Sequence, residues 1–131
     1  MAQEDKIKRE LDRIGMIIGM LVNKLLDKHN VPEEAIKDIM QQVQDELSID
    51  LEAFLNVEKE DGLHFLVNQK KFSIENLRNF GDLLYELGYK TNDRHRKDQL
   101  LTKACDVYEY VSNNANGTLF LDVEYRLKEL K

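Results

Sequence analysis

The chain has 131 residues, of which 42% are hydrophobic and 34% are charged, and its formal net charge is −6. This length and composition predict one folded domain over residues 1–131 and exclude an intrinsically disordered chain. The negative charge argues against nucleic acid as a partner. The single cysteine, Cys105, excludes an internal disulfide framework.

The first residues of the chain are polar and charged, so they lack the apolar segment of a secretory signal. Residues 14–22 form the longest apolar run, whereas a helix that crosses a bilayer needs about 20 such residues. We therefore expect a cytoplasmic protein without a membrane span.

Residues 4–29 predict a long helix, because apolar side chains recur at alternating steps of four and three residues, as in a heptad. This seam consists of Ile7, Leu11, Ile14, Ile18, Leu21 and Leu25. Gly15 and Gly19 flank the seam, and each lowers helix propensity by about 1 kcal/mol relative to alanine. We expect the close approach of another helix to offset this cost.

This helix is apolar on nearly every side, because four further residues extend its apolar character beyond the seam: Met16, Ile17, Met20 and Val22. Either the helix is the spine of a bundle, or a second chain covers one of its faces. The candidate interface with a protein partner or with a second copy, as in a homodimer, comprises Ile7, Leu11, Ile14, Gly15, Ile17, Ile18, Gly19, Met20, Leu21 and Leu25.

The next elements are also helical. Pro32 fits the first turn of a second helix, whose apolar face continues to Leu47. Ser48 or Asp50 begins a short third segment, and Asp50 is a good N-cap. Gly62 interrupts the pattern before another turn or two of helix.

In the second half of the chain, Ser73 is the predicted cap of a helix that Gly88 ends. Residues 91–93 supply the cap of the next helix, residues 113–117 form a loop, and Thr118 caps the last helix. No segment alternates with the period of a strand. The sequence therefore predicts an all-α fold, a bundle of five to seven helices with residues 4–29 as its spine.

Residues 74–111 carry a resemblance to a known motif. Gly81, an apolar residue three positions later and Gly88 resemble the first helix of a tetratricopeptide repeat, and Ala104 and Tyr108 are similar to the small and aromatic positions of its second helix. Gly81 and Ala104 are 23 positions apart, whereas the corresponding positions of the repeat are about 12 apart. No second copy of the motif follows. The resemblance implies a tetratricopeptide-like hairpin without the peptide groove of a repeat array.

Residues 5–19 resemble the beginning of small helical bacterial proteins whose function is uncharacterised. This resemblance implies a bacterial cytosolic source and no particular activity.

The sequence offers few groups for chemistry. His29, His64 and His95 form no pair at the spacing of metal ligands, so we predict no metal site. Cys105 lies in mid-helix without a neighbouring base and is interpreted as a small core residue. No glycine-rich phosphate loop occurs. We therefore predict no catalytic residue, no cofactor and no enzymatic activity.

One polar cluster stands out at the start of the sixth predicted helix. It consists of Arg94, His95, Arg96 and Lys97. Cations at a helix N-terminus oppose the helix dipole, so the cluster is either a weak anion site or an exposed turn whose charges pair with Asp93 and Asp98.

These patterns favour a non-catalytic helical protein–protein interaction or scaffold protein that self-associates through residues 4–29. The alternative is a binder of small molecules or anions, or a small enzyme, with a pocket between helices.

Overall fold

The computed structural model describes residues 2–117 and 119–131, and within these ranges it contains seven α-helices, one π-helical turn and no strand. In chain order the elements are α1 (Ala2–Leu26), α2 (Glu33–Leu47), α3 (Leu51–Leu55), α4 (Lys59–His64), η1 (Phe65–Gln69), α5 (Ile74–Lys90), α6 (Arg94–Asn114) and α7 (Leu121–Leu130). The prediction of an all-α bundle of five to seven helices is confirmed.

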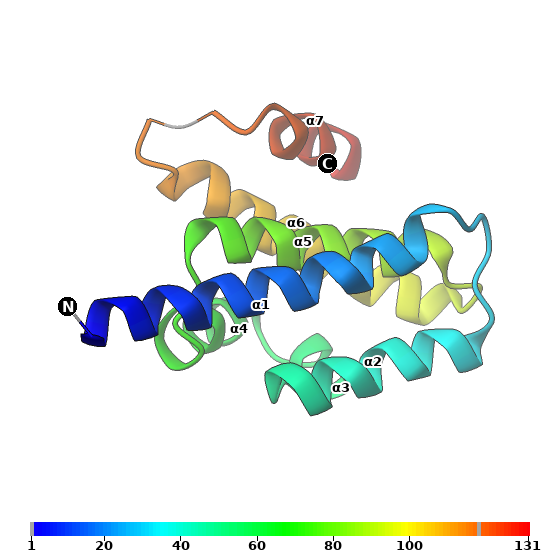
Figure 1. The fold of residues 1–131 in the computed structure, drawn as a ribbon. Helices are drawn as coiled ribbons and strands as arrows, with labels where there is room; N and C mark the ends of the chain where they lie inside the picture. Colours follow the sequence, from blue (N-terminus) through cyan, green and yellow to red (C-terminus); the bar gives the residue numbers. More distant parts are fainter. Residues whose placement is uncertain (1, 118) are drawn as a thin grey trace.

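The central helix is α5. It lies behind α1 and in front of α6, which runs back along it, while α2 lies to one side and α7 to the other (Figure 1). Five large side chains of α5 are almost completely buried: Leu77, Phe80, Leu83, Leu84 and Leu87. The expectation that residues 4–29 form the spine is wrong, because one side of α1 faces solvent.

The core is one continuous apolar cluster that receives side chains from α1, α2, α3, α5, α6 and α7. Phe80 lies at its centre and is fully buried. The rings of Phe54 and Phe72 meet it edge-on, at centroid distances of 5.6 and 5.8 Å. This geometry suits the aromatic quadrupole and joins α3, α5 and the segment that follows η1.

Local capping sets the beginnings of three helices. Asp50 accepts a hydrogen bond from the Ala53 amide at 3.1 Å, and Ser73 accepts one from the Asn76 amide at 3.1 Å. Asp93 caps α6 in the same way. These contacts join residues three positions apart. The sequence identified Ser73 directly, and the structure selects Asp50 over Ser48 and Asp93 among residues 91–93.

Other boundaries differ from expectation. The first helix ends at Leu26 rather than at residue 29. Gly88 does not end α5, which continues to Lys90. A Cβ atom at Gly88 would come within 2.6 Å of Leu101 Cδ2, so this glycine allows α6 to approach. Thr118 lies outside the described residues, and α7 begins at Leu121.

Candidate functional site

The outer face of α1, defined here by Met16, Gly19, Met20 and Asn23, carries two exposed apolar side chains. The side chains of Met16 and Met20 are 65% and 59% exposed. Residues 14–23 carry no charge, so the face is uncharged over more than two turns. In Figure 1, α1 crosses the front of the molecule with no other helix before it.

The candidate interface residues separate into groups in the structure. Four of them, Ile14, Ile18, Leu21 and Leu25, are buried in the core of their own chain. Leu11, Gly15, Ile17 and Gly19 are half-buried. Ile7 is 59% exposed near the N-terminal end of α1, and Met20 belongs to the outer face. The buried residues are thus committed to folding, whereas Ile7, Gly19 and Met20 remain accessible to a partner.

The two glycines of α1 have different surroundings. A Cβ atom at Gly15 would lie 3.0 Å from Asn76 Oδ1, so this glycine faces α5 closely. Asn76 is itself buried and donates a hydrogen bond from Nδ2 to the Leu11 carbonyl at 3.2 Å. Gly19 has nothing within 4 Å of such an atom. Only the first glycine is explained by packing within the chain.

Met16 was missing from the sequence-predicted interface. It lies one helical turn before Met20, and this i, i+4 spacing places both side chains on one face. That spacing was present in the sequence, but the heptad seam was the stronger pattern. Burial alone distinguishes the two faces, because four seam residues meet the core whereas the methionines do not.

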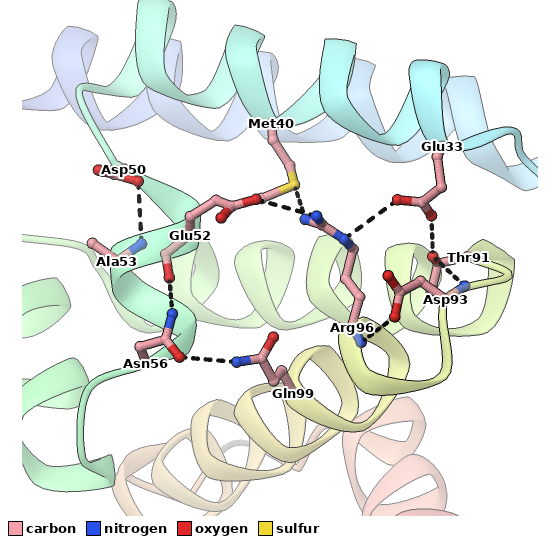
Figure 2. Close-up of polar contacts among 10 residues, drawn as sticks. All are labelled: Glu33, Met40, Asp50, Glu52, Ala53, Asn56, Thr91, Asp93, Arg96 and Gln99. Carbon is pink, nitrogen blue, oxygen red and sulfur yellow. Dashed lines mark hydrogen bonds and ion pairs between the residues drawn. The ribbon is translucent and has the colours of Figure 1, made fainter.

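The basic cluster at the start of α6 is divided by the structure. Arg94 and His95 are exposed, and Lys97 places its Nζ 5.3 Å from the centroid of the Tyr89 ring. Arg96 alone points into the molecule, toward α2 and α3 (Figure 2). The cluster therefore does not converge on one point.

Carboxylates surround the Arg96 guanidinium. Its Nη2 lies 3.2 Å from Glu52 Oε1 and its Nε lies 3.5 Å from Glu33 Oε2. Nη1 lies 2.9 Å from the sulfur of Met40. Figure 2 shows this arginine joining α6 to both α2 and α3. The sequence expectation that the cluster pairs with Asp93 and Asp98 missed these distant partners.

The N-cap residue of α6, Asp93, adds negative charge beside Arg96. The backbone amide of Arg96 donates to Asp93 Oδ1 at 3.0 Å, and this hydrogen bond lowers the pKa of Asp93. A cavity of about 180 Å³ next to Arg96 is lined by the side chains of both Glu52 and Asp93. His95 and Arg96 also line this cavity. An anion that entered it would meet the two carboxylates as well, and their charge opposes its binding.

A second polar network, which the sequence analysis missed, links α5, α6 and α7. The Tyr108 hydroxyl donates to Asp82 Oδ1 at 2.6 Å, and Arg126 Nη1 donates to the same oxygen. The Arg126 guanidinium also lies 4.6 Å from the centroid of the Tyr85 ring. No sequence signal could have found this network, because its members come from three helices.

Burial controls the protonation of this network. It raises the pKa of Asp82, against the hydrogen bond from Tyr108 and the charge of Arg126, which lower it. Burial and the neighbouring Asp82 charge both raise the pKa of Tyr108. Tyr108 therefore stays a neutral donor over the physiological range, and the network ties the three helices together.

Cys105 does not have the environment of a nucleophile. Burial raises the pKa of its thiol, and the carboxylate of Glu109, whose Oε1 lies 3.6 Å from Sγ, raises it further. A raised pKa keeps the thiol protonated and weakly reactive. Within the described part of the chain, no three His, Cys, Asp or Glu side chains come together as metal ligands would.

An apolar cavity of about 330 Å³ opens between α2, α3, α4 and η1. Its apolar lining comes from Ala53, Phe54, Val57 and Phe65, and its polar rim includes Asp50 and Asp61. This volume lies at the lower end of the range for small-molecule sites, which begins at about 300 Å³. The adjoining η1 is a π-helical turn, an element found frequently at functional sites.

None of the described helices has the length and apolar character needed to cross a membrane. No family model matches the sequence, and no curated protein or solved structure shows significant similarity to it. The tetratricopeptide-like resemblance, the bacterial source and the cytoplasmic location therefore stay predictions.

Proposed function

We propose that this chain is a non-catalytic helical interaction protein that self-associates through the outer face of α1. The observation that carries the proposal is the exposure of Met16 and Met20 on a helix whose opposite side fills the core. Burying an exposed methionine contributes about 1.5–3 kcal/mol. Methionine also adapts its shape to a partner surface more readily than branched residues do.

The absence of charge strengthens this proposal. Residues 14–23 have no charged side chain, in a chain that is 34% charged. Depletion of charge and enrichment in methionine are features of the cores of protein–protein interfaces. Gly19 adds a shallow step between the methionines, where the backbone of a partner helix can approach.

The α5–α6 pair supports the related proposal of a tetratricopeptide-like hairpin. A Cβ atom at Gly81 would lie 2.8 Å from the Tyr108 ring. A small residue of one helix is therefore packed against an aromatic residue of the next. This hairpin is the rigid support on which α1 lies.

Sedimentation velocity of the purified chain over the micromolar range tests the self-association. We expect a species heavier than the 15.4 kDa monomer, and we expect Met20→Glu to shift the distribution to monomer while the circular dichroism spectrum stays unchanged. Leu121→Glu is the matched control, because Leu121 is 72% exposed on α7. A wild-type chain that stays monomeric throughout would overturn the proposal.

A second candidate function, small-molecule binding, is favoured by the cavity beside η1. Val57 lines this cavity and is 40% exposed, so Val57→Trp would fill it with little disturbance of the core. A fragment screen by thermal shift tests the idea. A compound that raises the melting temperature of the wild type but not of Val57→Trp would support this function, and a screen without such a compound would count against it.

A further inference from the structure

We infer that the partner on the outer face of α1 is a second copy of this chain whose α1 runs antiparallel to the first, with a two-fold axis at the level of Ile18. The inference rests on the self-association proposed above and adds its geometry. Two-fold dimers are the commonest assemblies of identical chains. In this arrangement, positions that are equally distant from residue 18 in the two copies face each other.

The apolar centre of the face fits this axis. Met16 and Met20 are equally distant from Ile18, so the Met16 side chain of each copy would lie against Met20 of the other. Both side chains are exposed in the isolated chain. Gly19, which has open space around it, lets the two backbones approach between these methionine pairs.

The charges at the two ends of the face fit the same axis. Arg9 and Asp27 are both exposed and are also equally distant from Ile18. Arg9 lies within α1, and Asp27 directly follows its last residue, Leu26. The two positions are separated by about five turns at about 3.6 residues per turn, so Asp27 continues the line of Arg9 at the C-terminal end of the helix. Antiparallel packing therefore places the guanidinium of Arg9 against the carboxylate of Asp27, and the two-fold axis forms this pair twice.

The other cations near the face are directed to the side. Arg13 pairs with Glu10 at 3.1 Å and, in α2, with Glu46 at 3.9 Å. Lys24 donates from Nζ to Gln42 of α2 at 2.9 Å. These contacts draw both side chains toward α2.

Parallel packing of the same two faces would have the opposite electrostatic result. Arg9 would then face Arg9, and Asp27 would face Asp27. Like charges across an interface disfavour a complex. The distribution of charge along α1 thus selects the antiparallel dimer over the parallel one.

Charge reversal tests the orientation. In the antiparallel dimer, Arg9→Glu places two carboxylates together at each end of the interface, and we expect the dimer Kd to rise about tenfold. Adding Asp27→Arg to this variant exchanges the charges and should restore the wild-type Kd. Arg94→Glu, the same change at an exposed position of α6, is the matched control and should leave Kd unchanged.

Disulfide trapping gives an independent reading in a Cys105→Ser background. A mixture of Arg9→Cys and Asp27→Cys chains should form mixed disulfides on mild oxidation, because the two positions meet only between antiparallel copies. A wild-type chain that is monomeric contradicts the self-association itself. A dimer in which Arg9→Cys crosslinks with itself, or in which the charge exchange fails to restore Kd, overturns the antiparallel geometry alone.

Discussion

The backbone of Gly81 lies against the ring of Tyr108, so closely that a Cβ atom at position 81 would be 2.8 Å from Cε1 and 3.0 Å from Cδ1. The ring cannot move aside easily, because Tyr108 is fully buried and its hydroxyl is held by Asp82 and Arg126. The contact between α5 and α6 therefore requires glycine at this position.

Gly81→Ala should lower the free energy of unfolding by up to about 2 kcal/mol. Overpacking costs about 1–3 kcal/mol, and the gain of about 1 kcal/mol in helix propensity offsets part of it. Gly19→Ala is the matched control in the same type of element. Since Gly19 has open space, its substitution should raise stability by up to about 1 kcal/mol. Urea titration of dilute protein measures both, and equal effects would contradict the packing argument.

Arg96→Ala should be destabilising, whereas Arg94→Ala should not. The Arg96 side chain is only 16% exposed and pairs with Glu33 and Glu52. Its loss therefore removes the ion pairs that link α6 to α2 and α3. We expect a loss of about 1–2 kcal/mol, since hydrogen bonds to charged groups contribute about 1.5–3 kcal/mol and Glu52 is largely exposed. Arg94→Ala should change stability by less than about 0.5 kcal/mol. Denaturant unfolding measures the stability of both variants. Similar losses of stability for the two would refute this distinction.

The fold should become less stable at alkaline pH because of Tyr108. Its pKa in the folded state is raised above the ordinary value of 10.0, so the unfolded chain releases this proton first. The stabilisation that comes from this raised pKa is complete below pH 10.0, the ordinary pKa of tyrosine. Above that pH it declines by about 1.4 kcal/mol per pH unit for one proton. Tyr108→Phe should show a smaller decline between neutral and alkaline urea titrations.

The control for this pH dependence is Tyr125→Phe, because Tyr125 is exposed on α7. This variant should follow the wild-type pH profile. Tyr108→Phe should also lose about 1–2 kcal/mol at neutral pH, since Asp82 then lacks one hydrogen bond. An unchanged alkaline decline in Tyr108→Phe would assign the effect to other groups.

Cys105 should react slowly with a disulfide reagent at neutral pH in the folded protein. Burial and the Glu109 carboxylate raise its pKa, which lowers the fraction of thiolate, the reactive form. We expect the rate to be at least about tenfold below that of the denatured chain, and Glu109→Gln to increase it. Equal rates in native and denatured protein would show that the thiol is accessible and ionised.

The sequence determined most of the local structure. The apolar spacing fixed which segments are helical, and Asp50, Ser73 and Asp93 fixed where three of them begin. Each of these signals is contained within a few residues, because helix hydrogen bonds and caps join near neighbours in the chain. The all-α class and the absence of a strand among the described residues follow from them.

Contacts between distant segments of the chain decided which side chains pair with one another and which are buried. The partners of Arg96 lie in α2 and α3, and those of Asp82 lie in α6 and α7. Gly88 does not end α5 but lies within it, where α6 packs closely against the backbone. Both faces of α1 looked equally apolar in sequence, and only the position of α5 determined that Ile18 is buried while Met16 and Met20 face solvent. Burial depends on which surfaces meet in three dimensions, and periodicity along one helix does not contain that information.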